Sequence, residues 1–178
     1  MSRNTNRYVK ATAHAATRRR KPPMATLEEG KKAPAFTLPT DGDGTVSLKD
    51  FKGQNVVVYF YPKDDTPGCT KQAIGFTELQ DAFAEADTQI IGISKDPVAK
   101  HDKFKAKHDL GIILASDADS DVTEKFGSWV EKSMYGKTYM GIDRSTFLID
   151  GTGKIRQIWR KVRVKDHVAA VLEAAKAL

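Results

Sequence analysis

The chain of 178 residues contains a single cysteine, Cys69, and this scarcity excludes several classes of protein. An internal disulfide needs two cysteines, so a secreted disulfide scaffold is ruled out and a cytoplasmic, reducing compartment is expected. The histidines are scattered without the spacing of a zinc site, and each is interpreted as a surface residue. They are His14, His101, His108 and His167. We therefore predict no bound metal and no other cofactor.

Long hydrophobic runs are also missing, which indicates that the chain does not cross a membrane. The chain is nevertheless 40% hydrophobic, enough for one domain with a buried core.

Acidic residues are missing from residues 1–23, which hold seven Lys and Arg residues and no apolar periodicity. We interpret 1–23 as a disordered basic extension and 24–178 as the folded domain. Of the 29 basic residues, 22 then remain against 23 acidic ones, so the net charge of +6 belongs to the extension. Nucleic-acid binding by the folded part is not expected. An organelle transit peptide, a nucleic-acid-binding arm and a true start at Met24 stay open for the extension.

The apolar pattern of the remainder predicts alternating strands and helices. Its order is β-α-β-α-β, then a hairpin, then a helix. This order predicts an α/β protein with a thioredoxin-like arrangement, in which helices flank a mixed central sheet. The Gly-x-Gly at Gly151 is interpreted as a hairpin turn, because a strand follows it. The predicted strands are 35–39, 45–48, 55–61, 88–94, 112–115, 145–150 and 154–164, and the predicted helices are 67–86, 97–108, 121–126 and 166–178.

Cys69 lies where a reactive group is expected in such a fold. It follows the carboxyl end of a predicted central strand, where open α/β sheets place their sites. It also lies in the first turn of a predicted helix, where unpaired N–H groups and the helix dipole stabilise an anion. Thr66 precedes it by three residues, so its hydroxyl can reach the sulfur or a ligand oxygen. An inert, buried cysteine remains the alternative at this point.

The pattern Pro62-x-x-x-Thr66-x-x-Cys69 resembles the active-site motif of the peroxiredoxins. The longer run from Tyr59 to Thr70 is similar to one branch, the peroxiredoxin Q or bacterioferritin comigratory protein group. The resemblance extends from about Leu27 to Leu178 and includes the runs 126–132 and 136–150. It leaves the basic extension outside.

This resemblance implies a thioredoxin-like fold with peroxiredoxin insertions and a thiol peroxidase acting on hydrogen peroxide and organic hydroperoxides. Cys69 would be the peroxidatic nucleophile, which is oxidised to a sulfenic acid. Thr66 matches the hydroxyl that bonds the thiolate or the peroxide, and Pro62 matches the residue that shields the thiolate. Arg144 matches the arginine that stabilises the thiolate and the transition state. Only the resemblance brings Arg144 to a cysteine 75 residues earlier in the chain.

The chain departs from many members of this branch at Ile74, where they carry a resolving cysteine. With no second cysteine, the sulfenic acid requires an external thiol, either thioredoxin or glutathione with glutaredoxin. By analogy with the branch, we expect a monomer.

Two further features are interpreted as structural. The basic residues between Arg156 and Lys165 are favoured as a solvated strand face over a site for an anionic thiol. Trp129 and Trp159 are interpreted as packing residues. A different function also stays open, that of a catalytically weak thioredoxin-fold protein that binds a partner through its basic extension.

Overall fold

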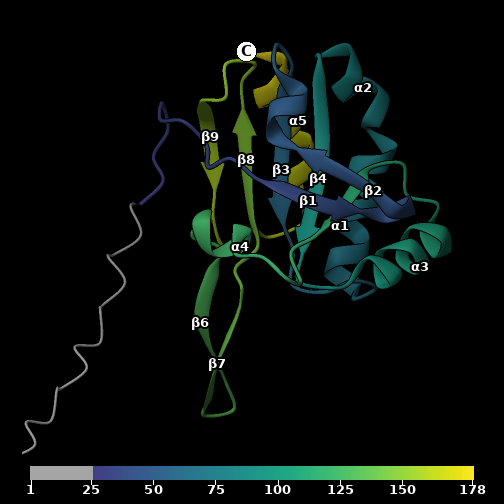
Figure 1. The fold of residues 1–178 in the computed structure, drawn as a ribbon, viewed down its shortest axis with the longest axis vertical. Coiled ribbons are helices and arrows are strands. Elements are labelled where there is room, and N and C mark those ends of the chain that lie inside the picture. The colour runs from purple at the N-terminus through teal and green to yellow at the C-terminus, as the bar shows by residue number, and fades with distance from the viewer. Residues whose placement is uncertain (1–25) are drawn as a thin grey trace, which may run out of the picture.

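The computed structural model describes residues 26–178, so the predicted extension 1–23 and the possible start at Met24 lie outside the described residues. A seven-stranded mixed sheet forms the centre, in the order β2-β1-β5-β4-β3-β8-β9 (Figure 1). Its strands are β1 Thr37–Thr40, β2 Gly44–Ser47, β3 Asn55–Phe60, β4 Thr88–Ser94, β5 Ile113–Ser116, β8 Ser145–Ile149 and β9 Ile155–Trp159. The helices are α1 Pro67–Glu78, α2 Gln80–Glu85, α3 Val98–His108, α4 Val122–Lys125 and α5 His167–Lys176.

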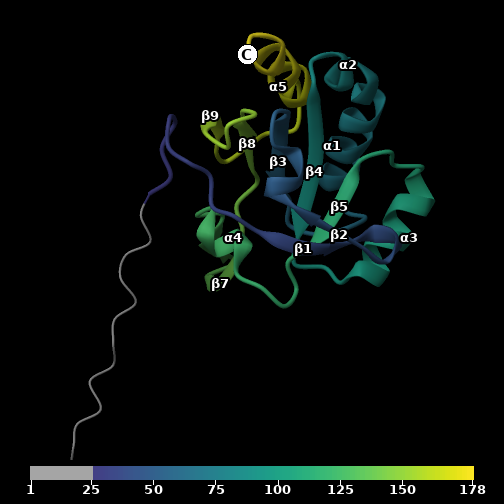
Figure 2. The ribbon, with the colours of Figure 1, turned by 45° about the horizontal axis from the view of Figure 1, so that its top comes forward.

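Strand β3 lies inside the sheet, parallel to β4 and antiparallel to β8. Its residues Val56–Phe60 are all buried, because both faces of the sheet are covered. One face carries a core with residues from α1, α2, α3 and α5, and the other packs against Phe126, next to α4. Figure 2 shows α1, α2 and α5 on one side of β3 and β4, with α4 on the other. The mixed sheet flanked by helices confirms the predicted fold class.

The predicted strands and helices are largely confirmed, with two differences in extent. The helix predicted over 67–86 is interrupted at Leu79, whose ψ of 8° separates α1 from α2. Gln80, the first residue of α2, is exposed. The strand predicted over 154–164 ends at Trp159. The Gly-x-Gly segment is a turn between β8 and β9, as predicted, and Gly153 has a φ of 84° there.

The interpretation of the histidines as surface residues is wrong for two of them. His101 is fully buried and His167 is 7% exposed, because each finds polar partners inside the fold. His108 is half-buried and pairs with Asp65, while His14 lies outside the described residues.

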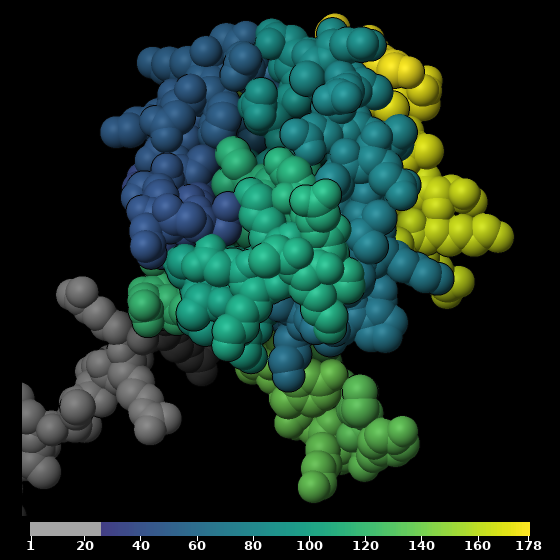
Figure 3. Space-filling model, turned by 90° about the vertical axis from the view of Figure 1, so that its right-hand side faces the viewer, coloured from purple at the N-terminus to yellow at the C-terminus, as the bar shows by residue number. Residues whose placement is uncertain are grey.

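A β-hairpin missed by the sequence prediction projects from the body. Strands β6 Trp129–Met134 and β7 Lys137–Ile142 pair antiparallel as a separate two-stranded sheet. Its tip is a two-residue turn in which Tyr135 and Gly136 both have positive φ, as a type I′ turn requires. We call residues 129–142 the arm. Figures 1 and 3 show it extending beyond the rounded body.

Candidate active site

Cys69 is the third residue of α1, which begins directly after the loop that follows β3. Pro67 occupies the first helical turn, where its missing N–H has no helical partner to lose. The Cys69 side chain is 2% exposed and belongs to the core that includes Tyr59 and Phe76. The fold therefore holds the only thiol at a helix start and almost fully covers it.

Arg144 lies between β7 and β8 and reaches the sulfur directly. Its Nη2 donates to Cys69 Sγ at 3.3 Å, across 75 residues of sequence. Gly68 permits this approach, because a Cβ there would lie only 3.3 Å from Nη2. The contact places the positive charge of the guanidinium directly against the sulfur.

Gln72 is a further site residue, which the sequence analysis missed. It is fully buried one turn after Cys69, and its Oε1 accepts a 2.6 Å hydrogen bond from Arg144 Nη1. The two terminal nitrogens of the guanidinium thus bind Gln72 and Cys69. Gln72 Nε2 has no hydrogen-bond partner among the described residues. A polar residue three positions after the cysteine lies on the same helix face, and that spacing was the available signal.

Thr66 and Pro62 are placed on the loop before the helix. The Thr66 hydroxyl donates to the carbonyl of Lys63 at 2.9 Å, rather than to the sulfur. Thr66 also forms the N-cap of α1 through its backbone, since Thr70 N donates to its carbonyl. Pro62 is exposed on the loop. The structure thus brings Arg144 onto Cys69, whereas Thr66 and Pro62 contribute to the loop beside it.

Tyr59 forms part of the wall beneath the thiol. Burial raises the pKa of its phenol well above the usual value, and the charge of Cys69 raises it further. Its hydroxyl is buried without a hydrogen-bond partner within 26–178. The ring stacks on Phe76, and Gly92 makes room for it, because a Cβ there would lie 2.7 Å from the phenol. Such unsatisfied buried groups are rare in folded proteins and concentrate at functional sites.

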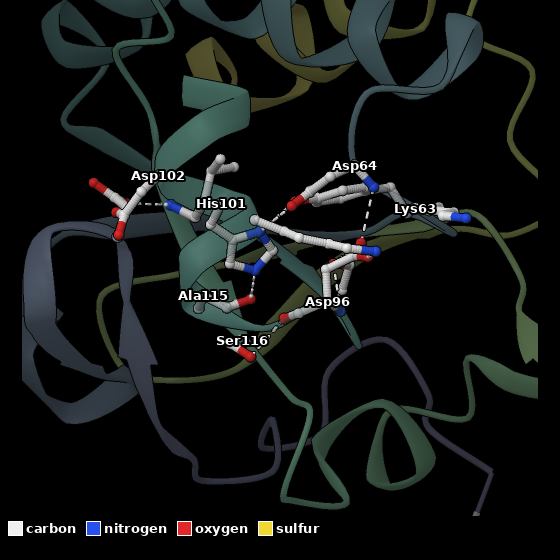
Figure 4. A network of polar contacts seen from close by, with 12 residues as sticks. Lys63, Asp64, Asp96, His101, Asp102, Ala115 and Ser116 are labelled. Atoms are coloured by element: carbon white, nitrogen blue, oxygen red, sulfur yellow. Dashed lines mark hydrogen bonds and ion pairs between the residues drawn. The ribbon is translucent and has the colours of Figure 1, made fainter. Parts of the chain in front are cut away.

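Asp64 anchors the loop before Cys69 through a buried polar network (Figure 4). Its carboxylate accepts from Tyr61 Oη and pairs with His101 Nδ1, both at 2.6 Å. His101 Nε2 lies 3.0 Å from the Ala115 carbonyl and donates to it. The backbone N–H of Asp64 donates to Asp96 Oδ2 at 2.8 Å. The network fixes the loop to α3, to β5 and to the segment that follows β4.

Asp65 adds a second, exposed attachment to the same helix. Its carboxylate pairs with Lys107 and His108 in the last turn of α3, at 2.7 and 2.8 Å. These hydrogen bonds, that of His108 foremost, lower the pKa of Asp65. Its φ of 58° is a left-handed conformation that few residue types adopt easily. Helix α3 thus holds two consecutive residues of the loop.

The basic segment after β9 borders the site. Arg160 donates to the carbonyls of Phe126 and Gly127, and its guanidinium lies over the ring of Phe147. Burial lowers the pKa of Arg160. The following residues are not a strand, although Val162 and Val164 are half-buried between exposed basic residues. A Cβ at Gly68 would lie 4.0 Å from Val164, so this segment lies against the start of α1.

Within residues 26–178, no group of three or more His, Cys, Asp or Glu side chains is arranged to bind a metal. None of the helices in this part of the chain has the length and hydrophobicity to span a membrane.

Comparisons with known proteins identify the family of the chain. The model of the AhpC/TSA family matches residues 30–158. The putative peroxiredoxin Bcp of Coxiella burnetii is 51% identical over 147 residues, which cover 83% of this chain and 97% of that protein. Peroxiredoxin Bcp of Bacillus subtilis is also 51% identical, over 85% of this chain and 96% of its own length.

Solved structures of this group share the fold. Peroxiredoxin Q of Xylella fastidiosa, as a cysteine-to-serine mutant, superposes with a TM-score of 0.81 and 36% identity, covering 85% of this chain and 96% of that one. The bacterioferritin comigratory protein of Xanthomonas campestris gives a TM-score of 0.77 and 43% identity, over 80% and 90% of the two chains.

Proposed function

The chain belongs to the AhpC/TSA family, within the Bcp or peroxiredoxin Q branch of these thioredoxin-fold thiol peroxidases, and from this premise we propose that Cys69 reduces hydroperoxides by a one-cysteine mechanism. The observation that carries the proposal is the 3.3 Å contact between Arg144 and the buried sulfur. A fixed cation on a covered thiol suits a nucleophile better than an inert core residue.

In the first half-reaction, the Cys69 thiolate attacks one oxygen of the hydroperoxide. A sulfur–oxygen bond forms and the oxygen–oxygen bond breaks, which leaves a sulfenic acid on Cys69. The departing oxygen takes a proton and leaves as water or an alcohol. Negative charge moves from sulfur to this oxygen, so a forked donor beside both atoms lowers the barrier. Arg144 is that donor, and Gln72 accepts a hydrogen bond from its other terminal nitrogen, Nη1.

Thr66 and Pro62 are proposed to complete the site around the peroxide. The Thr66 hydroxyl donates to the Lys63 carbonyl at rest, and its oxygen retains lone pairs that can accept a hydrogen bond from the O–H group of the peroxide. Pro62 would exclude water from the thiolate on the loop side. Both substrates named by the resemblance, hydrogen peroxide and organic hydroperoxides, are proposed for this site.

In the second half-reaction, an external thiol restores Cys69. The thiol attacks the sulfenic sulfur and releases water, and a second thiol then breaks the mixed disulfide. Ile74 occupies the position of the resolving cysteine, and its side chain is half-buried against the core. Arg144 contacts both Cys69 and Gln72 of its own chain, and we propose that a monomer suffices for peroxide attack.

Peroxide consumption in the presence of dithiothreitol tests the proposal. The wild-type protein is expected to consume peroxide catalytically, and Cys69→Ser is expected to be inactive while unfolding at the same temperature. Equal consumption by both proteins would contradict the assignment of Cys69.

A further inference from the structure

Apolar side chains gather on the arm in a way found nowhere else on the described part of the surface. Of the five large hydrophobic residues that are exposed within 26–178, four lie on it. They are Met134, Tyr135, Tyr139 and Met140, with exposed fractions of 55, 97, 45 and 50%. Met and Tyr are residue types enriched at protein–protein interfaces.

The arm also lacks the support that a two-stranded sheet requires. Its strands pair only with each other, so both outer edges keep unpaired backbone groups. Isolated hairpins are marginally stable in water. Figure 3 shows the arm projecting from the body, with its end uncovered. These properties are typical of a segment that binds another protein.

The root of the arm is continuous with the candidate active site. Strand β7 ends at Ile142, and Arg144 follows two residues later with its guanidinium on Cys69. Ser145, the next residue, pairs with Phe60, the last residue of the strand that leads to the Cys69 loop. A protein bound to the arm is therefore held at the edge of the sheet where Cys69 lies.

The surroundings of this edge are positively charged. Lys137 on the arm and Lys161, Arg163 and Lys165 on the segment beside Gly68 are exposed, and none forms an ion pair among the described residues. The acidic residues in or directly beside these segments are fewer, namely Glu131, Asp143 and Asp166. A complementary partner therefore has an apolar patch with acidic residues around it.

We propose that the arm and residues 161–165 form the docking surface for a protein dithiol that reduces oxidised Cys69. The inference rests on the proposed function, which requires an external thiol. The partner's thiol attacks the sulfenic sulfur, forming a mixed disulfide and water. The partner's second thiol then attacks its own bonded sulfur, which releases the Cys69 thiol and leaves the partner oxidised.

Docking raises the rate of reduction because Cys69 is only 2% exposed and is rarely accessible to a thiol. A thiol of the partner can reach a sulfur covered to this extent only after an opening of the structure around it. A partner already held on the arm presents its thiol at high effective concentration whenever that opening occurs.

The test compares two reductants on the same variants. The arm variant carries Met134→Ser, Tyr135→Ser and Met140→Ser. The matched control is Leu178→Ser, which removes the fifth exposed hydrophobic residue at the opposite end of the molecule (Figure 1). Peroxide turnover is measured with a bacterial thioredoxin and its reductase, and separately with dithiothreitol.

We expect the KM for thioredoxin to rise by about tenfold in the arm variant, since a few apolar anchors dominate such interfaces. Turnover with dithiothreitol should stay within about twofold of wild type, and Leu178→Ser should match wild type with both reductants. Lys137→Glu should raise the same KM, and the increase should shrink at high salt.

Several outcomes would overturn the inference. An unchanged KM for thioredoxin in the arm variant would do so, as would turnover supported by glutathione and not by thioredoxin. A wild-type dimer in sedimentation that the arm variant abolishes would assign the arm to self-association instead. Failure of the proposed function is distinguishable, because wild type would then not turn over with dithiothreitol either.

Discussion

Arg144 is the residue that ties the candidate nucleophile to the rest of the protein. One nitrogen binds the sulfur and the other binds Gln72, so both the charge and the fork are used. Sequence reasoning found Arg144 only through the family resemblance, because its spacing from Cys69 carries no signal. Gln72 and the partners of the buried histidines were missed, since a lone polar residue does not reveal a partner far away in sequence.

Replacement of Arg144 by lysine keeps the positive charge but removes the fork, the pair of terminal nitrogens that bind Gln72 and Cys69. An ammonium cannot hold Gln72 and the reacting atoms together, so we expect the second-order rate with peroxide to fall by about 100-fold. Stopped-flow tryptophan fluorescence after mixing with peroxide measures this rate. Arg163→Lys, at an exposed position, serves as control and should retain the wild-type rate. An unchanged rate in Arg144→Lys would refute the role of the fork.

His167 makes the stability of the folded state depend on pH. Burial, and to a lesser extent the charge of Arg144, lowers its pKa from 6.5 to about 4. Between these values the unfolded chain binds a proton that the folded chain does not, so this group destabilises the fold as the pH falls from about 6.5 to 4.

Removal of this titration should flatten the stability profile. In His167→Gln, we expect the loss of unfolding free energy between pH 7 and pH 4 to be smaller than in wild type by about 2 kcal/mol. Urea unfolding at three pH values measures it, and data above pH 7 give the baseline, where the imidazole is neutral in both states. Identical losses in the two proteins would show that His167 does not titrate in this way.

Among the elements, helix α3 has a role in holding the loop before Cys69 that its sequence did not predict. The helix predicted over 97–108 is confirmed, and its Phe104 is buried in the core. Its polar residues additionally hold the loop before Cys69 through Asp64 and Asp65. The arm was missed because its residues are mostly exposed and show no buried periodicity. The Tyr135-Gly136 turn between two extended runs was the overlooked signal.

The two histidines of α3 form a matched pair of tests. His101→Leu removes the imidazole that pairs with the buried Asp64 carboxylate and leaves it only the hydrogen bond from Tyr61, so it should cost about 3–5 kcal/mol of unfolding free energy. His108→Leu breaks an exposed pair with Asp65 and should cost about 0–1 kcal/mol. Chemical denaturation measures both.

A second variant keeps the comparison interpretable. Adding Asp64→Asn to His101→Leu removes the unpaired charge and should recover part of the loss. Similar costs for His101→Leu and His108→Leu would contradict the assignment of Asp64 as the buried anchor.

For the whole molecule, sequence pattern predicted the layers of the fold and the position of Cys69 at a strand–helix junction. It did not predict how β8 and the arm deliver Arg144, because pairing between distant strands depends on the assembled sheet. The described residues, 26–178, contain Cys69, Arg144 and Gln72 together. The contacts among these three residues are made entirely within 26–178.

Deletion of residues 1–23 should therefore leave the peroxidase reaction intact. It removes seven positive charges, which changes the formal net charge from +6 to −1. We expect turnover with dithiothreitol within about twofold of the full chain. Any salt-sensitive adhesion to nucleic acid should disappear with the extension. A large loss of turnover would show that the extension contributes to the active site.

The most direct test of the account is the oxidation state of Cys69 after a single turnover without reductant. The protein is treated with one equivalent of hydrogen peroxide and a sulfenic-acid trap such as dimedone, and its intact mass is measured. Wild type should gain one trap adduct per chain, and Cys69→Ser none. Absence of the adduct on wild type, or the same adduct on Cys69→Ser, would contradict a one-cysteine mechanism at this residue.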